Sequence, residues 1–178
     1  LKLAFSLGNI SHTGIFPKSK NLNVPKDYIN VVYCKNCSLV QLDRNFNLNY
    51  MFGKNYGYKS GTNKTMSSHL GNLAKKITKI FKLNTNDHVL DIASNDGTLL
   101  NFLKKDFMVE GVDPAKNFKS IHNKKNIKVY YDHFGTLFVN QKNLGSYDII
   151  IGVNVFDNFR RVVEAIKTIN KLLIKYHS

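Results

Sequence analysis

The chain has 178 residues, of which 43% are hydrophobic and 12% aromatic, a composition that excludes a disordered protein and predicts one domain with at most a small appendage. Lysine and arginine number 26 against 12 acidic residues, a net charge of +14 that suits phosphate-bearing substrates. The lysines are scattered rather than gathered with aromatic residues, so the pattern does not favour nucleic acid as the main partner. No apolar run approaches the roughly 20 residues of a membrane span, and we see no signal peptide. We therefore expect a cytoplasmic protein without a membrane partner.

The first half of the sequence predicts a small module and a linking helix. Residues 1–50 form an irregular β-rich module in which short β-like runs alternate with stretches rich in Gly, Pro and Asn. These runs are residues 3–7, 28–33 and 38–42. Residues 51–83 read as a loop and a linking helix, because apolar residues recur at spacings of three and four from 64 to 82.

Residues 84–178 show a strand–helix alternation. We expect strands at 89–92, 107–112, 127–131 and 147–155, and helices at 98–105, 114–121, 134–142 and 160–174. Strands that alternate with helices pair in parallel, so the fold class is α/β, with a partial Rossmann-like, doubly wound sheet of about four strands.

The turn after the first of these strands, "DIASNDG" from Asp91 to Gly97, is the candidate ligand site. Ligands of such sheets bind beyond the carboxyl ends of the strands. The turn lacks both the G-K-[ST] of a phosphate loop and the G-x-G-x-x-G of a dinucleotide site. Asp91 suits a cationic ligand, and Asp113, after the second strand, stands where a carboxylate holds ribose hydroxyls. This is the logic of an S-adenosylmethionine site, although Asp91 and Asp96 as plain helix caps remain an equal alternative.

An ordered set of segments resembles the nucleotide-sugar C-methyltransferase family. The matching segments are "LGNISHTGIFP", "VVYCKNCSLVQL", "YGYKSGTNKTMSSHL", "VLDIASNDGTLL", "GVDP" and "YDIIIGVNVF". The resemblance implies a zinc-ribbon-like module before a Rossmann-like S-adenosylmethionine domain. It also implies methyl transfer to a carbon of a nucleotide-linked keto-deoxysugar, which would be the small-molecule substrate. A base removes the acidic proton beside the ketone, and the resulting enolate attacks the methyl group.

The resemblance also implies roles for particular residues. Those that would contact S-adenosylmethionine are Asp91, Ala93, Ser94, Asn95, Asp96, Gly97, Asp113, Pro114 and Asn154. Those that would face the sugar or the chemistry are Tyr56, Tyr58, His69 and Asn158. Cys34 and Cys37 would be two of four Zn²⁺ ligands.

The sequence departs from the family pattern at three places. Cys34 and Cys37 form the only cysteine pair, so half of a zinc site, a plain buried pair and a redox dithiol all stay open. Asn158 stands where the family tends to carry a histidine, and asparagine cannot act as a base near neutral pH. The family's later strands would follow residue 178, so we expect a piece of a longer protein, truncated at both ends, or a degenerate gene product.

The remaining histidines do not supply an obvious base. We expect His88 and His122 to be solvated and His133 to lie in a surface loop. Two alternatives to the sugar methyltransferase follow. One is a methyltransferase with another small-molecule or RNA acceptor. The other is a truncated relative without catalytic activity.

Overall fold

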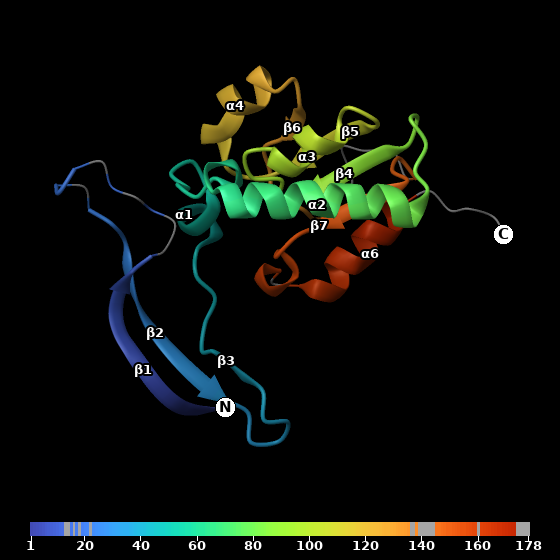
Figure 1. Cartoon of the computed structure of the whole chain (residues 1–178). Helices are drawn as coiled ribbons and strands as arrows, with labels where there is room; N and C mark the ends of the chain where they lie inside the picture. The colour runs from blue at the N-terminus through green and yellow to red at the C-terminus, as the bar shows by residue number, and fades with distance from the viewer. Residues whose placement is uncertain are drawn as a thin grey trace. The chain divides into compact units, whose positions relative to one another are not determined.

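The computed structural model describes residues 1–12, 15, 17, 19–21, 23–135, 138, 145–159 and 161–173. The chain divides into two compact units, Leu1–Tyr58 and Lys59–Ser178 (Figure 1). Within the described ranges, no helix is both long and apolar enough to cross a membrane.

The N-terminal unit is a three-stranded antiparallel sheet with one short helix. Its elements are β1 (Lys2–Ser11), β2 (Lys26–Tyr33), β3 (Val40–Leu42) and α1 (Leu48–Phe52). β2 is the central strand. At one end of the β1–β2 pair, His12 Nε2 lies 2.6 Å from Asp27 Oδ2, and the buried His12 ring packs against the edges of Phe46 and Tyr50. This hydrogen bond and the aromatic contacts hold the hairpin against the segment around α1.

The C-terminal unit contains a four-stranded parallel sheet in the order β6-β5-β4-β7. Its strands are β4 (His88–Ile92), β5 (Met108–Val112), β6 (Lys128–Tyr130) and β7 (Ile149–Gly152). Its helical elements are η1 (Ser60–Thr62), α2 (Lys64–Phe81), α3 (Thr98–Leu103), η2 (Lys116–Phe118), α4 (Lys119–Lys124), η3 (Phe156–Asn158) and α6 (Val162–Leu172). The strand order reverses between β4 and β7, which makes the end of β4 a switch point.

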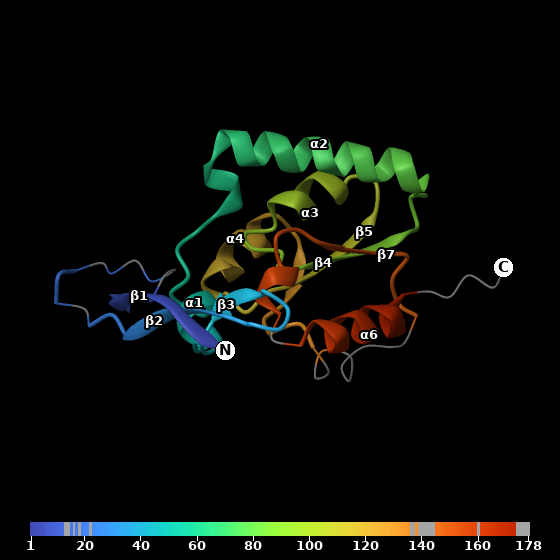
Figure 2. The same ribbon diagram turned by 90° about the horizontal axis from the view of Figure 1, so that it is seen from below.

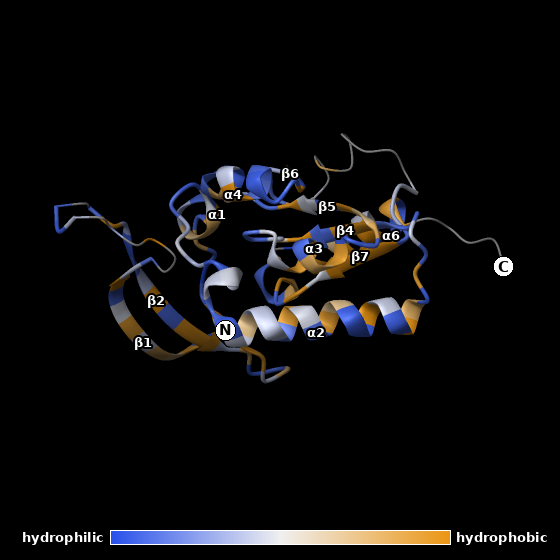
Figure 3. Ribbon diagram, turned by 45° about the horizontal axis from the view of Figure 1, so that its top comes forward, coloured by the Kyte–Doolittle hydropathy of each residue, from blue (hydrophilic) through white to orange (hydrophobic). Residues whose placement is uncertain are grey.

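Helices cover both faces of this sheet. Figure 2 shows α2 and α3 on one side and α6 on the other. The first face is closed by the buried side chains of Leu70, Ala74 and Ile77 from α2, which pack with Val89 of β4. Their spacing of three and four places them on one stripe of the helix, and Figure 3 shows the hydrophobic positions of α2 interleaved with hydrophilic ones. Burial of each such side chain contributes roughly 1.5–3 kcal/mol for the larger residues.

The other face combines an apolar cluster with one buried carboxylate. Leu90, Ile92 and Leu172 belong to the apolar cluster. Glu110, in the middle of β5, is 6% exposed. Its carboxylate accepts hydrogen bonds from Tyr147 Oη at 2.6 Å and Tyr130 Oη at 3.1 Å, and Lys128 Nζ lies 2.7 Å away. The buried charge is therefore compensated by two donors from the neighbouring strand β6 and one from the segment before β7.

The predicted α/β class and parallel sheet are confirmed, and the differences lie at the element ends. The strand expected at 147–155 is confined to β7, because Asn154 adopts a left-handed φ of 51° and η3 begins at Phe156. The loop expected at 51–63 contains η1 and the end of α1, whose N-cap is the Asn47 side chain. The helix expected at 134–142 falls mainly outside the described residues.

Candidate cofactor site

The turn between β4 and α3 lies at the carboxyl edge of the sheet, beside the corresponding end of β5. Asp91 of β4 is in register with Gly111 of β5, and the Ala93 N–H continues the pairing by donating to Val112 O at 2.8 Å. Asp113 follows directly on β5. The parallel register therefore brings together two carboxylates that stand 22 positions apart in the sequence, as expected from the strand pattern.

The backbone of the turn is unusual, because every second residue is left-handed. The φ angles of Ala93, Asn95 and Gly97 are 57°, 52° and 72°. A left-handed residue with a side chain costs roughly 1–2 kcal/mol, and such strain persists only where surrounding contacts impose it. Gly97 avoids that cost, and a Cβ there would also lie 3.2 Å from His122 Cδ2. The turn is thus a built conformation that needs support from its neighbours.

Asp113 is fixed at the end of β5 by two backbone donors. Its Oδ2 accepts from Asn95 N–H and its Oδ1 from Ala115 N–H, each at 2.8 Å. Burial raises the pKa of Asp113, and the two hydrogen bonds oppose that rise. Each carboxylate oxygen carries a second lone pair, so both oxygens can still accept a hydroxyl donor from a ligand.

Asp91 is the second buried carboxylate, and it is only 4% exposed. Among the described residues, no hydrogen bond to its side chain is found. Burial first, and the charge of Asp113 second, raise the pKa of Asp91 well above its usual value. Two buried carboxyl groups, one of which disfavours the ionisation of the other, form a site where a cationic, hydroxyl-bearing ligand would be stabilised.

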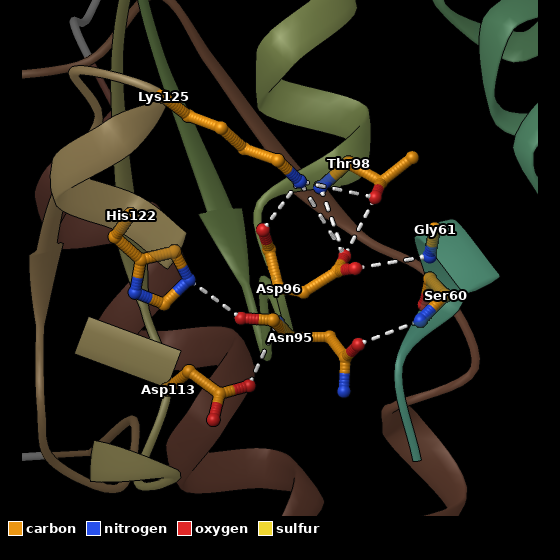
Figure 4. Close-up of polar contacts among 8 residues, drawn as sticks. All are labelled: Ser60, Gly61, Asn95, Asp96, Thr98, Asp113, His122 and Lys125. Carbon is orange, nitrogen blue, oxygen red and sulfur yellow. Dashed lines mark hydrogen bonds and ion pairs between the residues drawn. The ribbon is translucent and has the colours of Figure 1, made fainter. Parts of the chain in front are cut away.

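Asn95 and Asp96 point their side chains toward η1, which begins the C-terminal unit. Asn95 Oδ1 accepts from Ser60 N–H at 2.9 Å, and Asp96 Oδ2 accepts from Gly61 N–H at 3.0 Å (Figure 4). The other Asp96 oxygen accepts from Thr98 N–H at 3.2 Å and Thr98 Oγ1 at 2.6 Å. Asp96 therefore accepts from the first N–H of α3, next to the N-cap Gly97, and it also ties η1 to the turn.

The side chain of Ser94, within the turn, packs against β5. Its Oγ is buried and, within the described part of the chain, has no hydrogen-bond partner. The Ser94 side chain packs against Gly111, where an added Cβ would come within 2.9 Å of Ser94 Cβ and 3.0 Å of Leu100 Cδ1. Glycine at this position of β5 therefore lets the turn approach the sheet.

Two residues of the α4 region were missed by the sequence analysis. The expectation that His122 is solvated is wrong, because its side chain is fully buried. Its Nε2 lies 2.8 Å from Asn95 O, and Lys125 Nζ donates to Asp96 O at 2.7 Å. The spacing of three between His122 and Lys125, which puts them on one helical face, was the only available signal. Their partners lie 27 and 29 residues earlier in the chain.

The other predicted site residues lie outside the 91–97 turn. Asn154 is exposed after β7, and Asn158 is exposed in η3, where it donates to Asp157 Oδ1 at 3.2 Å. His69 is exposed on α2. Tyr56 and Tyr58 belong to the N-terminal unit, where their ring centroids are 6.5 Å apart. The structure thus brings together the predicted residues of the 91–97 turn with Asp113.

Cys34 and Cys37 lie in the turn between β2 and β3. Both are free thiols, Cys34 half-buried and Cys37 exposed. Backbone hydrogen bonds from Cys37 and Asn36 lower the pKa of Cys34. In the described ranges, no group of three or more His, Cys, Asp or Glu side chains is placed to hold a metal ion. A structural zinc site takes four ligands, so these two residues do not form one by themselves.

Comparisons with known proteins point to one fold. No protein-family model matches the chain, and no curated protein matches it. Among solved structures, the PH0226 protein from Pyrococcus horikoshii OT3 is similar, with a TM-score of 0.55, 18% identity and coverage of 66% of this chain and 57% of that chain. A SAM-dependent methyltransferase from Archaeoglobus fulgidus matches with a TM-score of 0.51, 17% identity and coverage of 61% and 48%. A trans-methyltransferase, CalH, in complex with SAH matches with a TM-score of 0.50, 17% identity and coverage of 61% and 36%.

At these identities the likeness establishes the fold alone. The α/β unit has a Rossmann-like fold, which it shares with these two solved methyltransferases. This chain covers less than two thirds of the length of each of the three solved chains.

Proposed function

We propose that the α/β unit binds S-adenosylmethionine at the turn after β4 and that the protein is a methyltransferase. One observation carries this proposal: two buried carboxylates, Asp91 and Asp113, stand at the carboxyl ends of neighbouring parallel strands. A ligand with a cationic amino group and a ribose diol matches this pair, because Asp91 then gains a partner and Asp113 fills its remaining lone pairs. The fold shared with known methyltransferases supports the same ligand.

The two carboxylates take different roles in this proposal. Asp113, held by two backbone donors, accepts the ribose hydroxyls through its remaining lone pairs. Asp91 balances the cationic end of the ligand, which offsets the cost of its own buried charge. When bound, S-adenosylmethionine supplies an electrophilic methyl group. The left-handed turn keeps small residues, Ala93 and Gly97, where the backbone approaches the ligand.

A nucleotide-linked keto-deoxysugar as acceptor, methylated on carbon, is the finer part of the proposal. Its support is the resemblance of the ordered sequence segments and a lysine surplus that suits a diphosphate. A base with a pKa near neutral is required. His69, exposed on α2, is the candidate within the α/β unit, and the family resemblance also implies Tyr56 and Tyr58. Asn158 cannot take this role.

Calorimetric titration of the chain with S-adenosylhomocysteine tests cofactor binding directly. We expect saturable binding of S-adenosylhomocysteine. Asp113→Ala should lower the affinity by about tenfold or more, the loss expected for one or two hydrogen bonds to a charged group. Asp106→Ala is the control, because Asp106 is an exposed carboxylate of the same unit. Absence of binding at millimolar ligand, in a chain shown by circular dichroism to be folded, would contradict the proposal.

The acceptor class needs its own experiment. Hydrogen exchange of residues 50–63 is measured with S-adenosylhomocysteine present, and a nucleoside-diphosphate-linked keto sugar is compared with a short RNA. Protection by the sugar nucleotide alone is the expected result. Protection by RNA alone would instead favour the RNA methyltransferase alternative.

Zinc binding and a cytoplasmic location rest on the sequence. We propose Cys34 and Cys37 as one half of a zinc site whose other two ligands come from outside the described residues. Elemental analysis of the purified chain and of Cys34→Ser checks this. Equal zinc content in both samples would remove the site. The location remains a prediction.

A further inference from the structure

Two consecutive residues of the turn, Asn95 and Asp96, are each hydrogen-bonded through both the side chain and the main-chain carbonyl. We infer that Asn95 and Asp96 are positioning residues that hold the turn to η1, and that His122 and Lys125 are positioning residues that hold it from behind. This inference rests on the proposed function, since the turn is taken to be the cofactor site. It assigns Asn95 and Asp96 a different role from the direct cofactor contact that the family resemblance implies.

We call the contacts of Asn95 and Asp96 with η1 and with the α4 region the clamp. Its front half consists of side-chain oxygens of the turn and main-chain donors of η1. Ser60 N–H and Gly61 N–H donate to Asn95 Oδ1 and Asp96 Oδ2. Gly61 allows this approach, because a Cβ there would lie 2.6 Å from Thr98 Oγ1 and 2.8 Å from Asp96 Oδ2. Figure 4 shows both side chains turned toward η1. Asp96 is 4% exposed, and its two oxygens are already engaged by three donors.

The rear half consists of side chains of the α4 region and main-chain oxygens of the turn, and Lys125 Nζ also lies 3.4 Å from Thr98 Oγ1 and 4.0 Å from Asp96 Oδ1. His122 Nε2 contacts Asn95 O at 2.8 Å, and Lys125 Nζ donates to Asp96 O at 2.7 Å. Lys104 of α3's C-terminal end donates to the Lys125 carbonyl, which ties α3 to the same corner. Figure 4 shows the two side chains converging on the turn from the side opposite η1. The two carbonyls therefore point away from η1.

The protonation of His122 follows from its partners. A carbonyl oxygen only accepts, so Nε2 carries the proton and donates to Asn95 O. Burial lowers the pKa of His122, which favours the neutral ring, and Nδ1 then accepts from Tyr131 Oη at 2.9 Å. Because Asn95 N–H donates to Asp113 Oδ2, an ordered chain of hydrogen bonds runs from Tyr131 through His122 and Asn95 to the carboxylate proposed to hold the ribose.

The clamp accounts for a turn that is otherwise costly. Ala93 and Asn95 are left-handed without being glycine, and each costs roughly 1–2 kcal/mol relative to a right-handed residue. If the Asn95 carbonyl were released, the left-handed backbone of Asn95 could relax, and the Asn95 N–H on the other side of its Cα, which orients Asp113, would shift with it. Loss of the rear contacts is therefore expected to reach the ligand through Asp113, without any direct contact between His122 or Lys125 and the ligand.

The test uses variants that remove each rear donor while keeping its bulk. Lys125→Met and His122→Phe remove the donors, and Lys125→Arg and His122→Gln restore one. Lys124→Met is the matched control, because Lys124 is an exposed neighbour on the same helix. Each full chain is titrated with S-adenosylhomocysteine. Hydrogen exchange of the ligand-free chain is followed in the peptide that covers residues 93–98, with α2 as internal reference.

We expect Lys125→Met and His122→Phe to weaken S-adenosylhomocysteine binding about five- to tenfold, the loss for one hydrogen bond, and to speed exchange at 93–98 but not in α2. The restoring variants should return both readouts toward those of Lys124→Met. Unchanged exchange at 93–98 in both donor-less variants overturns the inference, as does ligand affinity within twofold of the control. If His122→Phe unfolds, Lys125→Met decides. Faster exchange at 93–98 in a chain that does not bind the ligand at all refutes the proposed function and leaves the clamp standing.

Discussion

Replacement of Asp91 with asparagine is expected to stabilise the ligand-free α/β unit while it weakens ligand binding. Asp91 is 4% exposed, and no hydrogen bond to its carboxylate is found among the described residues. Burial and the nearby Asp113 charge raise its pKa well above 3.8, the ordinary value. Ionised Asp91 is therefore a cost to the fold at neutral pH. Asparagine fills nearly the same space without a charge.

The size and the pH dependence of this effect follow from the environment of Asp91. An unsatisfied buried polar group costs about 1–3 kcal/mol, and more when it is charged, and the asparagine amide retains part of that cost. We expect a gain of about 1 kcal/mol in the free energy of unfolding near pH 7.5, or roughly 3–6 °C in melting temperature. Below the unfolded pKa the carboxyl is protonated in both states. The gain therefore shrinks to nothing as the pH falls from the raised folded pKa toward 3.8.

Thermal and urea unfolding at pH 4 and pH 7.5, with calorimetric titration of S-adenosylhomocysteine, measures both effects. Asp106→Asn, an exposed carboxylate of the same unit, is the control. Loss of one charge-assisted contact should weaken binding by about 10- to 100-fold. A melting temperature at pH 7.5 below that of the control would show that the Asp91 carboxylate makes a stabilising contact. Unchanged affinity would show that it does not face the ligand.

Three further changes probe the surroundings of the site. Gly111→Ala should lower the free energy of unfolding by about 1–3 kcal/mol, because it overpacks the turn. Ser94→Gly should recover part of this loss in the double variant, as measured by urea unfolding. Additive losses would contradict the close packing of the two residues. Glu110→Gln should cost about 1.5–3 kcal/mol, whereas the exposed Glu164→Gln should cost little, and equal effects would mean that the buried cluster is not stabilising. Burial lowers the pKa of His122, while the effects of Lys125 and Asp96 on that pKa have opposite signs. The free energy of unfolding should therefore fall as the pH drops below about 6.5. His122→Gln should flatten this pH dependence, and an unchanged slope would refute the prediction.

Much of the fold was predictable because its signals are local. The apolar period of α2, the strand pattern around β4 and β5, and the glycine that opens α3 each act within a few residues. Element ends were less predictable. The left-handed φ of Asn154 ends β7 early. Asparagine also occurs in strands and helices, so an asparagine at this position does not by itself predict a turn.

The sequence by itself determined the α/β class and an acidic turn that reaches the sheet edge together with Asp113, because strand direction and register follow from the strand–helix alternation. Only the tertiary structure decided what holds that turn. Asn95 and Asp96 meet Ser60 and Gly61 across 35 residues of sequence, and meet the α4 region across 27 and 29. Such contacts depend on where η1 and α4 pack against the turn, and packing geometry leaves no periodic mark in the sequence. For the same reason a histidine in a lysine- and asparagine-rich segment turned out to be fully buried.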